Sequence, residues 1–262
     1  MVQCAPMSNP AVSSAPTFSP LYRQIKHLLV QRLESAQWRP GEAIPSESDL
    51  ALHFGVSQGT VRKAIDEMVA ENLLVRRQGK GTFVATHDDP RAFFRFLRLV
   101  PLAGGVESAR SVPLECWRAK AGTEAARMLA LQVGDPIVIV RRLLKFAEKP
   151  VVVDEIYLPG EIFGALTLEL LRDYEGSLYS FFENRFAIRM IRAEERLRAV
   201  AADRGSAERL GVAEGSPLLS VERVSFTYGE RPVEWRRGLY STAHHCYFNE
   251  LGIAPASGKS GR

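Results

Sequence analysis

The segment from residue 45 to residue 84 limits the possible folds of this 262-residue chain more than any other part of it. It reads PSESDLALHFGVSQGTVRKAIDEMVAENLLVRRQGKGTFV and contains two short stretches with apolar residues at helical spacing. Ser46 and Ser57 stand where N-caps belong, and Gly55 and Asn72 stand where the two stretches end. The pattern predicts two short helices joined by a tight turn.

A further helix and a hairpin complete this predicted unit. Apolar residues at helical spacing predict a helix over 21–35, which the sequence WRPG at 38–41 ends. Residues 73–77 and 81–84 are expected to form two strands around a QGK tip. An exposed helix start combined with a cationic hairpin tip is typical of units that bind the grooves and phosphates of duplex DNA.

The helix that begins after Ser57 is expected to enter the major groove by its N-terminal end. Gln58 could pair bidentately with adenine, and Arg62 could bind guanine or a phosphate. Thr60 is expected to donate to a phosphate, and Gly59 leaves room for close approach to the duplex. A merely solvated charged face is the alternative, but the charges coincide with a capped turn and a hairpin, which favours DNA. The residues expected at the DNA surface are Ser46, Ser48, Ser57, Gln58, Gly59, Thr60, Arg62, Lys63, Arg76, Arg77, Gln78, Gly79 and Lys80.

Composition excludes several classes of protein but does not by itself identify a DNA-binding one. The net charge is +4, and residues 1–96 hold 11 of the 34 Lys and Arg against 9 of the 30 Asp and Glu. No apolar run approaches the roughly 20 residues that span a bilayer, and the first 20 residues do not resemble a secretory signal. Cys4, Cys116 and Cys246 lie far apart, which favours a reducing, cytoplasmic setting without disulfides.

The pattern changes after a polar joint at 86–90. Strand-like runs and short helices follow, and several of the strands are joined by hairpin turns, which predicts an α+β domain with an antiparallel sheet. The expected strands are 112–119, 136–146, 151–158, 188–200, 218–228 and 233–243, and the expected helices are 123–131, 177–186 and 206–210.

Residues 21–84 resemble the winged helix-turn-helix of the GntR family of bacterial transcription regulators. The resemblance rests on LYRQI, the PSE start, FGVS, TVRKAI and the wing RRQGKGTFV. It implies a homodimer that binds a palindromic operator, in line with the rule that a two-fold protein binds a two-fold site. Ser48 and Gln58 stand where the family often has Arg, so the usual operator preference does not carry over intact.

The second half resembles the UTRA effector domain, which places the chain in the HutC-like branch of that family. The motifs are LGVAEGSPLLSVERV, PVEWRRGLY, SLY at 177–179 and DEIYLP at 154–159. The resemblance implies a fold similar to chorismate lyase, with a small-molecule pocket beside its sheet. The implied effector-binding residues are Arg142, Asp154, Ser177, Tyr179, Glu234 and Tyr240, and Glu155 is an equally plausible acid in place of Asp154.

The chemistry of the implied effector stays open between a carboxylate and a phosphorylated metabolite. Arg142 matches the first Arg of an Arg-x-Arg strand motif that holds effector anions, but Leu144 stands at the second position. The absence of the second Arg weakens the case for a phosphorylated sugar, although one guanidinium can still bind a carboxylate or phosphate bidentately. Packing or pairing inside the domain is the alternative role for each of these residues.

We therefore expect a ligand-responsive DNA-binding regulator, most simply a repressor of metabolic or transport genes, and not an enzyme. An enzyme with a lyase-like pocket tethered to DNA and a purely architectural DNA binder are the alternatives. No cofactor or metal is expected: adjacent His244 and His245 point to opposite faces of a strand, and Glu194-Glu195 is interpreted as strand surface. The expected organisation is a disordered tail (1–19), a DNA-binding domain (20–86), a linker (87–93), an effector domain (94–250) and a flexible tail (251–262).

Overall fold

The structure is a computed structural model that describes residues 19–88, 97–105 and 107–249. The chain divides between Thr82 and Phe83 into two compact units, and residues 39–42 belong with the second unit. The predicted terminal tails lie outside the described residues except for Ser19, as does the predicted linker beyond Asp88. None of the described helices is long and apolar enough to cross a membrane.

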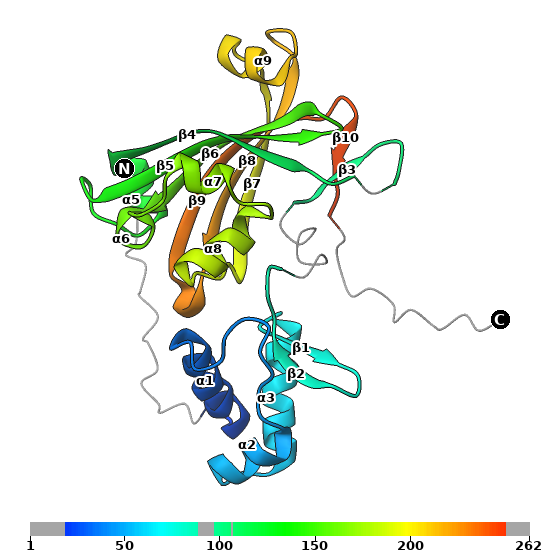
Figure 1. Cartoon of the computed structure of the whole chain (residues 1–262), viewed down its shortest axis with the longest axis vertical. Coiled ribbons are helices and arrows are strands. Elements are labelled where there is room, and N and C mark those ends of the chain that lie inside the picture. Colours follow the sequence, from blue (N-terminus) through cyan, green and yellow to red (C-terminus); the bar gives the residue numbers. More distant parts are fainter. Residues whose placement is uncertain (1–18, 89–96, 106, 250–262) are drawn as a thin grey trace, which may run out of the picture. The chain divides into compact units, whose positions relative to one another are not determined.

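The described residues of the first unit include three helices (Figure 1). They are α1 (Leu21–Glu34), α2 (Glu47–Phe54) and α3 (Gln58–Ala70). The predicted caps are confirmed, since Ser46 Oγ accepts from the Asp49 amide and Ser57 Oγ accepts from the Thr60 amide, both at 3.2 Å. The helices bury one apolar face each, and the side chains at the centre of this core are Leu29, Leu50, Val61, Ile65 and Met68.

The hairpin consists of β1 (Leu74–Arg77) and β2 (Gly81–Val84). The Lys80 amide donates to the Arg77 carbonyl at 2.9 Å and closes the turn. Gly79 and Gly81 have φ angles of +70° and +106°, a region in which side chains with a Cβ are strained, so glycine is needed at this tip.

An antiparallel six-stranded sheet, in the order β4-β5-β6-β9-β8-β7, is the centre of the second unit and confirms the predicted α+β class. The strands are β4 (Arg110–Lys120), β5 (Pro136–Phe146), β6 (Lys149–Pro159), β7 (Arg192–Ala201), β8 (Pro217–Phe226) and β9 (Pro232–Ser241). The predicted hairpin of the second and third strands is confirmed by the pairing of Arg142 with Asp154.

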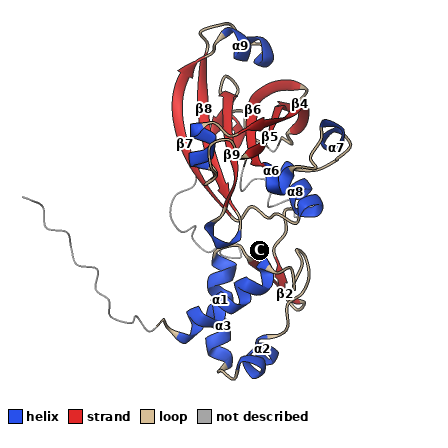
Figure 2. Ribbon diagram, turned by 90° about the vertical axis from the view of Figure 1, so that its left-hand side faces the viewer, coloured by secondary structure: helices blue, strands red, loops and turns tan. Residues whose placement is uncertain are grey.

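Helices cover the sheet on both faces. On one face, Phe163 of α6 (Gly160–Phe163) and Phe182 of α8 (Leu178–Phe186) pack with Val140, and α7 (Leu168–Arg172) lies beside them (Figure 2). On the other face, α5 (Thr123–Met128) packs with Ile139. The remaining elements are α9 (Arg204–Leu210), the 3₁₀ turn Tyr228–Glu230, and the paired short strands β3 (Leu99–Pro101) and β10 (His245–Tyr247).

Several boundaries differ from those expected. The strand predicted from residue 188 begins only at Arg192, because Ile188–Ile191 form the connection from α8 and Met190 is buried in the core. The helix predicted over 123–131 ends at Met128, and Ala130 adopts a φ of +52°. The sequence analysis did not predict α6, α7, β3 and β10, because each has only three to five residues and carries little periodicity.

Candidate functional site

The start of α3 is open to solvent. Gln58, Gly59, Arg62 and Lys63 are exposed, and Thr60 is half-buried with its hydroxyl 2.9 Å from that of Ser57. The amides at the start of a helix attract anions, and here no acidic side chain occupies the first turn. This turn therefore has the chemistry that a phosphate or a base edge requires.

Glu47, in the first turn of α2, holds two of the arginines that the sequence assigned to DNA. Its carboxylate accepts from Arg62 Nε and from Arg76 Nη2, both at 2.9 Å, and Arg76 also pairs with Asp66 at 2.8 Å. These contacts bring the starts of α2 and α3 together with β1. Hydrogen bonding and charge from Glu47 raise the pKa of Arg62, so its guanidinium stays charged.

The remaining residues of the predicted DNA surface are also accessible. Lys63 Nζ lies 4.0 Å from the centre of the Tyr22 ring, a cation–π contact that leaves the ammonium at the surface. Every other residue of the set is exposed, and they are Ser46, Ser48, Ser57, Arg76, Arg77, Gln78, Gly79 and Lys80.

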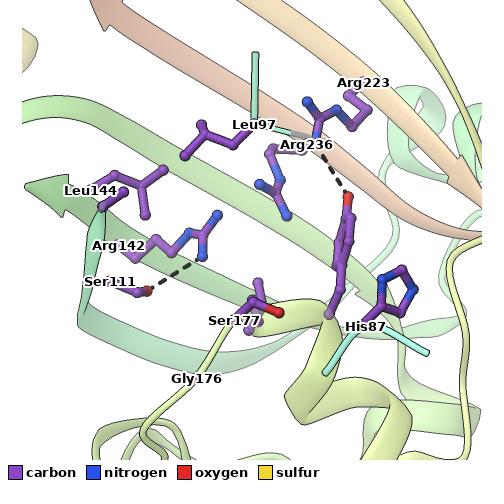
Figure 3. A pocket seen from close by; sticks show the side chains of 12 residues that line it. His87, Leu97, Ser111, Arg142, Leu144, Gly176, Ser177, Arg223 and Arg236 are labelled. Atoms are coloured by element: carbon purple, nitrogen blue, oxygen red, sulfur yellow. Dashed lines mark hydrogen bonds between the residues drawn. The ribbon is translucent and has the colours of Figure 1, made fainter. Parts of the chain in front are cut away.

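A cavity of about 60 Å³ lies in the second unit, on the face of the sheet that α8 covers (Figure 3). Arg142, Ser177 and Tyr179 of the predicted effector residues line it. Arg142 and Arg236 project toward the space between them, and Ser177 approaches from the start of α8. Every second side chain of β5, β6, β9 and β8 points to this face of the sheet. Polar residues that are far apart in the sequence therefore lie next to one another beside the cavity.

Two buried ion pairs share Asp154. Arg142 donates from Nε and Nη2 to Asp154 Oδ2 at 3.0 and 2.9 Å, and Arg236 Nη1 lies 3.4 Å from the same oxygen. Arg236 Nη2 donates to Glu234 Oε2 at 2.8 Å. Burial lowers the pKa of Arg142, and the charge of Arg236 lowers it further. Burial also opposes the charged form of Arg236, but Glu234, Tyr179 and Asp154 together outweigh burial and raise its pKa.

Tyr179 links this cluster to a third arginine. Its hydroxyl donates to Glu234 Oε1 at 2.9 Å and accepts from Arg223 Nη1 at 3.4 Å. Burial raises the pKa of Tyr179, and the charge of Glu234 adds to the effect, so the phenol keeps its proton. Arg223 Nε donates to Glu195 Oε1 at 2.6 Å.

Three of the predicted effector residues lie behind the cavity wall. Asp154 and Glu234 are fully buried and Tyr240 is 1% exposed, and none of them lines the cavity. Tyr240 and Asp154 border Gly238, at which a Cβ would stand 2.4 Å from Tyr240 Cε1 and 2.8 Å from Asp154 Oδ1. Only glycine fits there, and the two carboxylates hold Arg142 and Arg236, which line the cavity.

The sequence analysis missed part of the cavity lining. Ser111, Arg223 and Arg236 line it, and so does His87, whose ring centre is 5.5 Å from that of Tyr179. Strand alternation was the available signal for Arg236, which lies two residues after Glu234 and therefore on the same face.

Glu195 corrects one sequence interpretation. It was assigned with Glu194 to a strand surface, but it binds Arg223, which is 2% exposed, and it accepts from the Tyr247 hydroxyl. Its side chain lies on the cluster side of the sheet, whereas Glu194 pairs at the surface with Arg192. Among the described residues no group of His, Cys, Asp and Glu could hold a metal ion.

The segment that follows the hairpin is anchored on α8. The Thr86 hydroxyl donates to Glu183, and the His87 amide donates to Glu183 Oε2 at 3.2 Å. Asp88 accepts from the Ser180 hydroxyl and from Asn184 Nδ2, the latter at 3.3 Å. Since Ser177 and Leu178 at the start of the same helix line the cavity, this segment and the cavity share one element.

Comparison with known proteins agrees with both units. Residues 21–84 match the model of the "Bacterial regulatory proteins, gntR family", and residues 108–245 match the UTRA domain. The HTH-type transcriptional regulator SmoD of Agrobacterium fabrum is 29% identical over 79% of this chain and 85% of that protein. The histidine utilization repressor of Pseudomonas putida is 27% identical over 87% of this chain and 90% of that protein, as the HutC-like resemblance implied.

A solved structure supports the same assignment for the second unit. The ligand-binding domain of a GntR-family transcriptional regulator from Bordetella bronchiseptica is 50% identical, covers 60% of this chain and 98% of its own, and has a TM-score of 0.59. The UTRA match alone spans more than half of the sequence. The chain belongs to the gntR family of bacterial regulatory proteins and carries an UTRA domain.

Proposed function

We propose that this transcriptional regulator is a homodimeric repressor that leaves a palindromic operator when a small molecule fills the cavity beside α8. DNA binding and ligand response follow from its family. The observation that carries the finer proposal is the segment Thr86–Asp88. It begins two residues after β2, contributes His87 to the cavity lining, and is held by α8.

DNA recognition is assigned to the first turn of α3 and the hairpin tip. Gln58 and Arg62 read bases or bind phosphates in the major groove, and the tip residues Arg77 and Lys80 bind phosphates or the minor groove. The Glu47 carboxylate, which holds Arg62 and Arg76, has to release them when phosphates take its place. Two such units in a two-fold dimer match a two-fold operator.

The response to the ligand requires different ligand affinities in the DNA-bound and released states. A molecule in the cavity contacts Tyr179, His87 and the start of α8, and thereby acts on the anchor that Glu183 provides for Thr86 and His87. Loosening or tightening that anchor changes how the chain leaves β2. The name of the histidine utilization repressor supports repression as the output.

The enzyme alternative finds no support in the comparisons. Both family models that match the chain describe regulatory proteins, and the relatives SmoD and the histidine utilization repressor are transcription regulators. We expect the ligand to be recovered unchanged after incubation, and the protein to act in the cytoplasm, where the chromosome is.

Charge reversal at the DNA surface tests the proposal. The probe is the DNA that flanks the coding region of this protein, in a gel-retardation assay. Arg62→Glu combined with Arg77→Glu is expected to weaken binding on the order of 100-fold, because two phosphate or base contacts become repulsive. The matched control, Arg127→Glu with Arg204→Glu, changes the net charge equally at exposed sites of the second unit and should stay within about threefold of wild type. Unchanged retardation by the first variant would refute the DNA assignment.

A further inference from the structure

The charges around the cavity balance one another. Arg142, Arg223 and Arg236 are at most 6% exposed, and each is paired with a carboxylate. The carboxylates are Asp154, Glu195 and Glu234, so three positive charges meet three negative ones. A ligand with two negative charges would therefore find no surplus of positive charge in this cluster to offset its desolvation.

A single negative charge is nevertheless well placed beside Arg142. Nε and Nη2 donate to Asp154 and Nη1 donates to Ser111 at 3.3 Å, which uses three of the five N–H groups of a guanidinium and leaves two. The cavity also meets the N-terminal end of α8, a nine-residue helix without an acidic residue in its first turn. Ser177 caps that helix and lines the cavity, and helix starts favour anions.

The cavity continues into a larger groove with an apolar wall. The groove has a volume of about 840 Å³ and shares Ser111, Arg142 and Ser177 with the cavity. Its apolar lining residues are Ala109, Pro113, Val140, Leu171, Leu178 and Phe181. Its charged lining residues other than Arg142 are the exposed Arg110, Arg172 and Glu175, and Arg110 is paired with Glu148. The groove thus has room for an apolar group much larger than the polar group that fits the cavity.

We propose that the effector is a monocarboxylate with an apolar aromatic or acyl body. Its carboxylate binds Arg142 and the hydroxyls of Ser111 and Ser177, and its body lies in the groove against Leu171 and Phe181. This inference rests on the proposed function, since it names the class of effector for the same site. Sugar phosphates are disfavoured by their second charge and by their lack of an apolar body.

Thermal unfolding of the full-length protein in the presence of matched compounds tests the proposal. The compounds are phenylacetate and octanoate, 2-phenylethanol (an apolar body without charge), acetate (a charge without the body) and glucose 6-phosphate. Phenylacetate or octanoate is expected to raise the melting temperature by about 3 °C or more, because a ligand that binds the folded state stabilises it. The three other compounds should raise it by less than about 1 °C at the same concentration.

Two variants locate the binding. Leu171→Asp places a charge in the groove wall, and Ser111→Ala removes a hydroxyl beside Arg142 without disturbing the buried ion pairs. Both should reduce the shift that the acids produce, with the larger loss for Leu171→Asp. Leu197→Asp is the matched control, because Leu197 is 46% exposed on β7 and lines neither the cavity nor the groove. It should keep the full shift.

The failure of this inference can be told apart from a failure of the proposed function. A shift with glucose 6-phosphate but not with the acids, abolished by Ser111→Ala, would overturn the effector class and leave an effector at this site. An equal shift with phenylacetate in Leu171→Asp and wild type would also overturn it. No shift with any compound would overturn it too, and the gel-retardation assay would still decide DNA binding independently.

Discussion

Arginine lies in opposite surroundings in the two units. In the first unit, Arg62 and Arg76 have side chains that are 55% and 43% exposed, and both pair with Glu47 at the surface. In the second unit, Arg142 and Arg236 are about 5% exposed and pair with Asp154 and Glu234 inside the domain. Exposed pairs exchange partners at little cost, which suits phosphates that come and go, whereas buried pairs fix the donors before a ligand arrives.

The largest effect is expected when a buried pair is broken. Asp154→Ala leaves Arg142 and Arg236 without a shared carboxylate, and it should lower the free energy of unfolding by about 3–5 kcal/mol. Glu115→Ala removes the surface partner of Arg141, one residue away on the other face, and should cost under about 1 kcal/mol. Urea denaturation measures both. Equal losses would mean that burial does not distinguish the two kinds of arginine.

Removal of the Gln58 side chain should change the sequence preference of the first unit and leave the buried cluster untouched. If Gln58 pairs with adenine, Gln58→Ala should lose about 1–3 kcal/mol of discrimination at one operator position. Binding to a set of operators with single base changes measures the loss. An unaltered preference at every position would show that Gln58 does not read a base.

Glu47→Gln tests whether the ion pairs with Glu47 keep Arg62 and Arg76 from binding DNA. Releasing Arg62 and Arg76 from the carboxylate should raise the affinity for DNA about three- to tenfold and steepen its salt dependence. Glu34→Gln is the matched control, because it removes the same charge at an exposed position at the end of α1. If the two variants behave alike, the gain comes from net charge and not from the released arginines.

The smallest expected effect concerns Glu183. Burial raises its pKa above the ordinary 4.5, against the hydrogen bonds from Thr86 and the His87 amide and the charge of Arg189. Just above pH 4.5, the folded state therefore keeps a proton that the unfolded state has released. The free energy of unfolding falls as the pH rises through that window, by under about 1 kcal/mol because the hydrogen bonds and the charge of Arg189 offset part of the effect of burial.

Glu183→Gln should lack this part of the pH dependence, and Glu208→Gln, at an exposed side chain of α9, should keep it. Urea denaturation of the three proteins between pH 4.5 and 7 measures the difference. If the free energy of unfolding of Glu183→Gln and of wild type depended on pH in the same way, Glu183 would not contribute to the pH dependence. The same Glu183→Gln protein, tested for release from DNA by its effector, shows whether the anchor on Thr86 and His87 transmits the response.

The sequence was sufficient for the features that depend on local pattern. The caps at Ser46 and Ser57 and the glycine-rich hairpin tip follow from neighbouring residues, so they were predictable. Arg142, Ser177 and Tyr179, carried over from a family resemblance, do line the cavity. The position of Ser177 follows both from the family resemblance and from its role as the N-cap of α8.

Features that depend on pairing across long stretches of sequence were not predictable. Glu47 lies 15 residues before Arg62 and 29 before Arg76, and no local pattern shows that it holds both. Glu195 was interpreted as a surface residue, because an alternating Arg/Glu strand does not reveal that Arg223 of the next strand is buried. The anchor of Thr86 on Glu183 spans 97 residues and depends on the tertiary fold alone.

The confined space around Gly238 has a consequence for how such a sensor can change over generations. A methyl group at this position would overlap both the Tyr240 ring and a carboxylate oxygen of Asp154, although the backbone there does not demand glycine. Any larger residue is thereby excluded at position 238, in the centre of the sheet. New ligand preferences are expected to arise at the half-buried rim, where Ser111 and Leu171 line the cavity or the groove and take no part in the buried ion pairs.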